Sequence, residues 1–232
     1  MPSATPPHRP VCAVCLRPQR ACICGWITPV AHHVEVVVLQ HPLEVNQAKG
    51  SARLLHLSLP RSLLVTGEVF AEDHLQALID APLTAATSAP RHTLLLYPDS
   101  PPNAAPGAPP PPPALQAEHL ANPQQLRLIV LDGTWRKSRK MLHLNPLLQR
   151  LPRLALKAMP ASRYRIRKAH LPDQLSTLEA TCAALAQLEA DAGRFEPLLA
   201  AFDGFVAQQS GYTPASSRTR SLACCCSAHI SA

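Results

Sequence analysis

The stretch Leu128-Ile129-Val130-Leu131-Asp132-Gly133-Thr134-Trp135 decides how this chain is expected to fold. Its first four residues are apolar and two adjacent ones are β-branched, which is typical of a strand buried on both faces. Asp132-Gly133 then ends the strand, because glycine accepts backbone angles that other residues avoid. The pattern predicts a strand and a turn at the place where an open α/β sheet binds its ligand.

A basic helix is expected directly after this turn, over residues 136–144, with Asn145-Pro146 stopping it. Four of its first five residues are basic, namely Arg136, Lys137, Arg139 and Lys140. They favour an anionic partner close to the turn. A plainer interpretation is that Asp132 or Thr134 only caps the helix and that Trp135 packs against the protein.

Four further strands are predicted on either side of this stretch. They cover residues 34–40, 62–66, 93–98, which runs into a break at Pro98, and 151–156, which a proline interrupts and which therefore belongs near an edge. Helices are expected between or after them, over residues 46–57, 72–79, 176–189 and 196–209. Because strands and helices alternate, the fold class is predicted as α/β with a mainly parallel sheet.

Composition limits the class of protein and its partners. The 232 residues include 22 Lys and Arg against 15 Asp and Glu, a net charge of +7, which favours a polyanion such as nucleic acid. No apolar run approaches the roughly 20 residues of a membrane-spanning helix, so no membrane partner is expected. Residues 1–10 are predicted to be a disordered leader without the apolar centre of a signal peptide, which favours a cytoplasmic location.

A small zinc-binding element is predicted at residues 11–28, ahead of an α/β domain at residues 29–209. Its ligands would be four closely spaced cysteines, Cys12, Cys15, Cys22 and Cys24, whose sulfurs suit a tetrahedral Zn²⁺. Four protein ligands leave no open position, so the predicted zinc is structural. The alternative is four free thiols without a metal. Residues 210–232, with Cys224-Cys225-Cys226, are predicted to be a disordered tail.

Two segments of the predicted α/β domain have unusual composition. Residues 98–113 hold nine prolines in sixteen positions and are expected to form an elongated surface insertion. In the second segment, Arg163, Arg165 and Arg167 alternate with Tyr164 and Ile166. An extended backbone would point the three guanidinium groups to one side, where they suit phosphate oxygens. A solvated charged surface is the alternative.

Several stretches together resemble one family, the DTW-domain proteins, which are tRNA-uridine aminocarboxypropyltransferases. The defining D-x-T-W motif stands here as Asp132-Gly133-Thr134-Trp135. The resemblance also includes Cys12-x2-Cys15-x6-Cys22-x-Cys24, Gln40-His41-Pro42-x-Glu44, Leu96-Tyr97-Pro98, Tyr164-Arg165-Ile166-Arg167-Lys168 and Leu175-Ser176-Thr177-Leu178-Glu179-Ala180. These pieces span about residues 11–209 in order, which makes the match specific, although the proline-rich insertion departs from the family pattern.

This resemblance implies a SPOUT-like fold with a C-terminal trefoil knot, although nothing in the residue pattern itself indicates a knot. It implies transfer of the 3-amino-3-carboxypropyl group of S-adenosylmethionine to N3 of a tRNA uridine, with release of methylthioadenosine. The residues expected to bind the donor are Tyr97, Pro98, Asp132, Gly133, Thr134, Trp135, Leu175, Ser176, Thr177 and Glu179. Those expected to bind RNA are Arg53, Arg136, Lys137, Arg139, Lys140, Arg163, Arg165, Arg167 and Lys168.

Asp132 is the candidate catalytic residue, because it is the only acid at the predicted strand exit inside the motif. It would either deprotonate uracil N3 or only orient the base by hydrogen bonding. An aspartate with an ordinary pKa near ~4 is a poor base, so the first role would require partial burial. Two other functions stay open at this point: a SPOUT-type RNA methyltransferase, and a non-catalytic zinc-ribbon protein that binds RNA.

Overall fold

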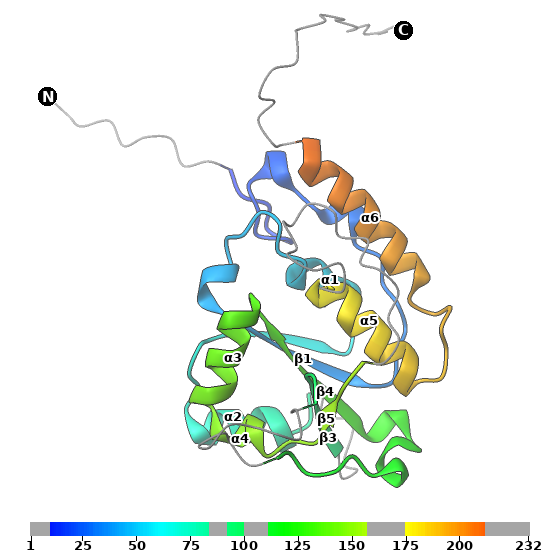
Figure 1. Ribbon diagram of the computed structural model, residues 1–232. Helices are drawn as coiled ribbons and strands as arrows, with labels where there is room; N and C mark the ends of the chain where they lie inside the picture. The colour runs from blue at the N-terminus through cyan, green and yellow to red at the C-terminus, as the bar shows by residue number, and fades with distance from the viewer. Residues whose placement is uncertain (1–9, 84–91, 100–110, 157–174, 212–232) are drawn as a thin grey trace, which may run out of the picture.

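The computed structural model describes residues 10–83, 92–99, 111–156 and 175–211 (Figure 1). Its centre is a sheet of five strands: β1 Glu35–Gln40, β2 Ser62–Thr66, β3 His92–Leu96, β4 Leu126–Asp132 and β5 Arg153–Leu154. The strand order is β2-β1-β4-β3-β5, and every neighbouring pair is parallel. The predicted α/β class with a mainly parallel sheet is therefore confirmed.

Helices cover both faces of the sheet, because the central strands are apolar on both sides. Val36 and Val38 of β1 pack in one core cluster with α1 Ala52–Ser58, α5 Thr177–Leu188 and α6 Glu196–Gly211. Val37 and Leu39 face the other cluster, formed with α2 Glu72–Asp80, α3 Trp135–Leu144 and α4 Pro146–Gln149. Figure 1 shows α5 and α6 on one side of the strands and α3 on the other.

Short 3₁₀ helices occupy several connections. They are η1 Gln19–Ala21, η2 Cys24–Trp26, η3 Pro42–Glu44, η4 Ala117–Leu120 and η5 Pro123–Gln125. The third follows β1 directly and brings Glu44 into a buried position. Among the described residues, no helix combines the length and the apolar character that crossing a membrane requires.

The helix expected over residues 46–57 is shorter than predicted, and this correction has a physical cause. Residues 45–50 form turns, and α1 begins only at Ala52. The guanidinium of Arg17 donates to the carbonyl oxygens of Ala48 at 2.6 Å and Gly50 at 2.7 Å. Since these carbonyls bind Arg17, the segment serves as a docking loop for the Cys-rich element.

The last predicted strand is also shorter than expected, although it lies at the sheet edge as predicted. Only Arg153 and Leu154 belong to β5, and they pair with Leu95 and Leu96. Pro152 contributes its carbonyl oxygen to the amide of Leu95 but has no N–H of its own to donate. The ladder is therefore limited to this short segment.

Other predictions fall outside the described residues. The knot depends on the path between β5 and α5, which includes residues 157–174. The leader at 1–10 lies outside except for Pro10, and so does most of the insertion at 98–113. The tail at 210–232 lies outside except for Ser210 and Gly211, which correct its predicted start because they belong to α6.

The Cys-rich element at residues 11–28 is fastened to the last helix. The indole of Trp26 lies over Gly204 of α6 so closely that a Cβ there would stand 2.1 Å from Cζ3. Gln208 completes the contact, because its Oε1 accepts from Trp26 Nε1 and its Nε2 donates to the carbonyl of Cys22 at 3.1 Å. The Cys-rich element and α6 therefore pack directly against each other.

Candidate functional site

A buried carboxylate lies where β1 and β4 end. Gln40 and Asp132 are the last residues of these strands and stand opposite each other in the ladder. Asp132 is 4% exposed, and its Oδ2 accepts a hydrogen bond from Gln40 Nε2 at 2.8 Å. Its Oδ1 accepts from Thr177 Oγ1 at 2.6 Å. Asp132 is thus fixed from two sides at the carboxyl edge of the sheet.

The start of α5 brings Thr177 to this carboxylate. The predicted capping box is confirmed: Ser176 donates its amide to Glu179 Oε2 at 2.8 Å, and Glu179 donates its amide to Ser176 Oγ at 3.2 Å. These two side chains face each other and close the helix end. Thr177, the first residue of the helix, is the one whose side chain reaches Asp132, while Leu175 lies half-buried just before it.

Gln40 is a site residue that the sequence-based list omitted. It is 6% exposed and ends β1 next to His41, whose amide donates to the carbonyl of Asp132 at 2.9 Å. The available signal was its position at the start of the Gln-His-Pro-x-Glu stretch after a strong strand. Gln40 is a polar residue at the end of a buried strand. Few hydrogen-bonding partners lie within its reach other than the end of the neighbouring strand, which is Asp132.

An aromatic stack lies on the α3 side of the same edge. The rings of Tyr97 and Trp135 are stacked with centroids 5.2 Å apart and planes inclined by 16°. The guanidinium of Arg153 lies 5.3 Å from the centroid of Tyr97 and donates to the carbonyl of Pro98 at 3.4 Å. Trp135 is 52% exposed. In the stack Arg153–Tyr97–Trp135, the outermost ring is therefore the solvent-exposed indole of Trp135.

Burial raises the pKa of Tyr97, although the charges of Arg153 and Arg139 act in the opposite direction. The tyrosine is consequently a neutral stacking partner at neutral pH. Within the turn, Thr134 is the N-cap of α3, and its hydroxyl accepts from the amide of Lys137 at 3.4 Å. Gly133 permits close packing, because a Cβ there would lie 3.1 Å from the Cβ of Lys137.

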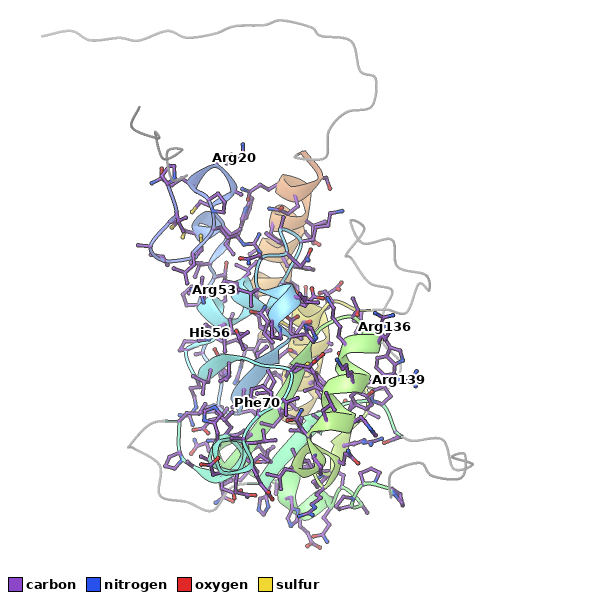
Figure 2. All side chains as sticks on the ribbon, turned by 90° about the vertical axis from the view of Figure 1, so that its left-hand side faces the viewer. Arg20, Arg53, His56, Phe70, Arg136 and Arg139 are labelled. Carbon is purple, nitrogen blue, oxygen red and sulfur yellow. The ribbon has the colours of Figure 1, made fainter. Side chains whose placement is uncertain are left out.

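The basic cluster of α3 divides into two pairs. Lys137 Nζ lies 2.7 Å from Glu44 Oε1, and Lys140 Nζ lies 2.9 Å from Glu68 Oε2. Arg136 and Arg139 are exposed (Figure 2), and no acidic partner for either occurs within the part of the chain that the structure describes. The prediction from sequence treated the four basic residues of α3 as equivalent. The structure places them in different surroundings.

The remaining predicted RNA-binding residues are only partly described. Arg53 lies near the start of α1, and its Nη2 donates to the carbonyl of Val14 in the Cys-rich element at 3.4 Å. Figure 2 shows Arg53 between Arg20 of that element and Arg136 of α3. Arg163, Arg165, Arg167 and Lys168 lie outside the described residues.

The four cysteines converge as a metal site requires. The sulfurs of Cys12 and Cys24 are 3.5 Å apart, those of Cys15 and Cys22 are 3.7 Å apart, and all four lie within 4.8 Å of one another. A tetrahedral Zn²⁺ with Zn–S bonds of about 2.3 Å separates its sulfurs by about 3.8 Å. The donor set and its spacing therefore fit a structural zinc ion.

The thiols of this cluster differ in acidity. Hydrogen bonds from the backbone of Cys15 and Val14 lower the pKa of Cys12 to about 6. Burial, followed by the neighbouring thiol of Cys22, raises the pKa of Cys24 to about 12. Proteins bind zinc through thiolates, so a divalent cation among the sulfurs would compensate for the charge that burial disfavours.

A surface hollow of about 460 Å³ lies elsewhere, lined by residues that include His32, His33 and Arg194. It is not the candidate site, because these histidines precede β1 and so lie at the opposite edge of the sheet from Asp132. Arg194 is also engaged there, since it forms ion pairs with Glu189 and Asp191.

The chain is similar to curated proteins named tRNA-uridine aminocarboxypropyltransferase. It is 32% identical to tRNA-uridine aminocarboxypropyltransferase 2 of Drosophila melanogaster over 196 residues, which cover 81% of this chain and 70% of the relative. The corresponding protein of Mus musculus is 30% identical over 78% of this chain and 57% of its own length. The tRNA-uridine aminocarboxypropyltransferase A of Arabidopsis thaliana is 30% identical over 58% of this chain and 50% of its own length.

No solved structure matches the chain significantly. The DTW domain matches residues 9–210, which include the Cys-rich element, all five strands and the Asp132 site. This match covers most of the sequence, as does the similarity to the protein of Drosophila melanogaster. The chain belongs to the DTW-domain family.

Proposed function

We propose that this protein is a tRNA-uridine aminocarboxypropyltransferase. It would transfer the 3-amino-3-carboxypropyl group of S-adenosylmethionine to N3 of a tRNA uridine and release methylthioadenosine. The observation that carries the proposal is the buried Asp132, held by Gln40 and Thr177 at the carboxyl edge of a parallel sheet. Ligands of open α/β sheets bind at this edge, and the relatives at about 30% identity bear the name of this activity.

The reaction needs a nucleophile and a directed attack. Uracil N3 loses its proton and forms a bond to the terminal carbon of the aminocarboxypropyl group. The bond between this carbon and sulfur breaks, and the sulfonium becomes the neutral thioether of methylthioadenosine. Because three carbons on the sulfonium are open to attack, the protein must select one of them by position.

Asp132 is suited to receive or orient the N3 proton. Each oxygen of its carboxylate accepts one of the two hydrogen bonds described above, and a carboxylate offers about four acceptor positions. These two hydrogen bonds fix the carboxylate at the carboxyl edge of the sheet, where open α/β sheets bind their ligands. The two donors also hold the carboxylate in one orientation, which is the requirement for a group that acts by position.

The donor would bind around the turn after β4 and the start of α5, through Tyr97, Pro98, Gly133, Thr134, Trp135, Leu175, Ser176, Thr177 and Glu179. The N-termini of α3 and α5 both lie at this edge, and helix N-termini favour the carboxylate of an amino acid. The donor supplies the sulfonium-activated carbon. The half-exposed indole of Trp135 is available to stack on a nucleobase.

The tRNA would bind along the basic side chains of α3 and the half-buried Arg53 of α1. Arg136 follows Trp135 in the sequence, and Figure 2 shows Arg136 and Arg139 along α3 and Arg53 toward the Cys-rich element. Arg163, Arg165, Arg167 and Lys168 are proposed to add further phosphate contacts. Zinc bound by the four cysteines would have a structural role.

Mass spectrometry of nucleosides tests this proposal. tRNA incubated with the protein and S-adenosylmethionine should yield 3-(3-amino-3-carboxypropyl)uridine in the nucleoside digest and methylthioadenosine in the small-molecule fraction. A methylated nucleoside together with S-adenosylhomocysteine would identify an RNA methyltransferase instead. Binding of tRNA with neither product, and without affinity for S-adenosylmethionine in a calorimetric titration, would identify a non-catalytic RNA-binding protein.

A further inference from the structure

Helix α3 presents two different basic stripes. Residues three apart on a helix lie on the same side, so Lys137 and Lys140 share one stripe and Arg136 and Arg139 share the next. The lysines pair with acidic side chains of the loops that follow β1 and β2, although the Lys140 side chain is 58% exposed, and the arginines face solvent (Figure 2). Lysine and arginine thus occupy distinct chemical surroundings within five residues of one helix.

The contact of Lys137 is the more buried of the two. Glu44 ends the short helix after β1 and is only 4% exposed, and the Lys137 side chain is 23% exposed. A carboxylate so far from water must be balanced by charge or by hydrogen bonds. The ammonium of Lys137 supplies one such partner and joins the first turn of α3 to the exit loop of β1.

The contact of Lys140 reaches the exit loop of β2. Glu68 binds Lys140 and also His41, whose Nε2 lies 2.8 Å from Glu68 Oε1. Since His41 Nδ1 accepts from the amide of Leu43, the proton of the neutral ring is on Nε2 and is donated to Glu68. These contacts lower the pKa of Glu68, first through the hydrogen bond from Lys140.

The far end of α3 is tied to the same loop. Asn145 is 2% exposed, and its Nδ2 donates to the carbonyls of Glu68 at 2.9 Å and Met141 at 2.6 Å. Its Oδ1 accepts from the amide of Phe70 at 3.0 Å. Helix α3 is therefore attached at its beginning, middle and end to the two loops that leave the neighbouring strands.

The geometry points to Lys137 and Lys140 as positioning residues that hold α3 against the exit loops of β1 and β2, while Arg136 and Arg139 alone of this cluster contact tRNA phosphates. This assignment rests on the proposed function for its RNA part. It changes the expectation from the sequence, in which all four side chains bind RNA. The position of Trp135 relative to Asp132 then depends on the Glu44–Lys137 pair, because Trp135 is the first residue of α3 and lies in the same helical turn as Lys137.

Two neighbouring variants test the division. Lys137→Met and Arg136→Met each remove one positive charge from the same turn of the same helix. Arg136→Met should raise the KM for tRNA and reduce the slope of log affinity against log salt by about one. Lys137→Met should leave that slope unchanged but lower kcat by up to about 10²-fold, since a misplacement near 1 Å can have this effect. It should also lower the Tm more than Arg136→Met does.

A double variant separates positioning from contact with RNA. Lys137→Met alone removes the ammonium from a buried carboxylate, whereas Glu44→Met with Lys137→Met removes both charges and is expected to recover most of the lost Tm and kcat. If Lys137→Met flattens the salt slope by about one and the double variant recovers nothing, Lys137 binds RNA and the inference is wrong.

The same experiments distinguish failure of the inference from failure of the proposed function. If the unsubstituted protein binds no tRNA and forms no product, the proposed function is wrong. The Tm comparison then still decides whether Lys137 positions α3. If Lys137→Met melts at the temperature of the unsubstituted protein, the positioning role is wrong whatever the substrate.

Discussion

A buried carboxylate lies at the end of a strand at each edge of the central sheet, Glu35 at the start of β1 and Asp132 at the end of β4, and the partners described for the two differ. At the amino edge, Glu35 is 1% exposed and binds Arg127, with Oε2 lying 2.6 Å from Nη2, and also Arg61 at 3.3 Å. At the carboxyl edge, Asp132 accepts hydrogen bonds from the side-chain amide of Gln40 and the hydroxyl of Thr177. Guanidinium partners compensate the charge of a buried carboxylate, whereas an amide and a hydroxyl orient a carboxylate by hydrogen bonding.

The contacts of Arg127 at the amino edge are expected to stabilise the fold. Besides Glu35, the guanidinium of Arg127 donates to the carbonyls of Leu78, Ile79 and Ala81, which close the end of α2. Arg127 is fully buried, so these bonds replace the water that it loses on folding. The comparison predicts that substitutions at this edge change the free energy of unfolding and that substitutions at the other edge change turnover.

The largest effect is expected from Asp132→Asn. The amide keeps the size of the side chain and can still bond to Gln40 and Thr177 after these rotate, but it cannot take a proton. Turnover should fall by about 10²–10⁴-fold with the Tm almost unchanged. Glu35→Gln is the matched control and should lower the Tm while each folded molecule keeps its turnover. Turnover of Asp132→Asn within a few-fold of the unsubstituted protein would remove Asp132 from the chemistry.

Arg127→Met should give the largest change in stability. It leaves Glu35 without its main cation and the end of α2 without its cap, so the free energy of unfolding should fall by about 3–5 kcal/mol. Urea denaturation measures this loss. Adding Glu35→Met to this variant should recover part of the lost stability, because the buried carboxylate that Arg127 compensated is then also removed. A loss of turnover without a loss of stability would contradict the contrast between the edges.

Thr177→Val should produce a moderate loss of turnover. The valine keeps the shape of the side chain but donates no hydrogen bond to Asp132 Oδ1. A hydrogen bond to a charged group contributes about 1.5–3 kcal/mol, so kcat should fall roughly 10–100-fold. Thr177→Ser keeps the hydroxyl and should retain most of the activity. Equal turnover of the valine and serine variants would show that Gln40 is sufficient to orient Asp132.

The smallest expected effect is a pH dependence at the amino edge. Burial lowers the pKa of His32 below 6.5, and the neutral ring accepts from the amide of Arg61 through Nε2 and donates to the carbonyl of Val34 through Nδ1. The neutral form therefore stabilises the fold above pH 6.5, and this contribution is lost as the pH falls below that value.

Urea midpoints measured between pH 7 and pH 5 should show this loss in the unsubstituted protein. His32→Gln should reduce it, and His56, whose pKa burial also lowers, should account for part of the remainder. Identical pH profiles for the unsubstituted protein and the variant would assign the dependence to other groups.

Local patterns in the sequence predicted most elements of the fold. The run before Asp132 became β4, the Ser176–Glu179 box closes α5, and the four cysteines meet, because each of these features is determined by residues close together in the chain. The start of the helix expected from Asn46 was wrong, because it depends on a residue distant in the chain. Arg17, about 30 positions earlier, binds the carbonyl of Ala48 ahead of α1.

Partners distant in sequence could not be predicted in the same way. Asp132 binds Gln40, 92 positions away, and Lys137 binds Glu44, 93 positions away. Charge patterning identified α3 as basic, but the direction of each side chain depends on which loops lie beside the helix. The division into lysines paired with acidic side chains and arginines facing solvent is thus a property of the tertiary structure.

The contact of Trp26 with Gly204 and Gln208 has a consequence for biosynthesis. Cys22 and Gln208 are 186 positions apart, and a ribosome adding roughly 5–20 residues per second needs roughly 10–40 s to cover that distance. During this interval the indole that later lies over α6 has no helix to cover it. Metal ligation needs only the local sequence, so zinc can order the nascent element before its docking helix has been translated.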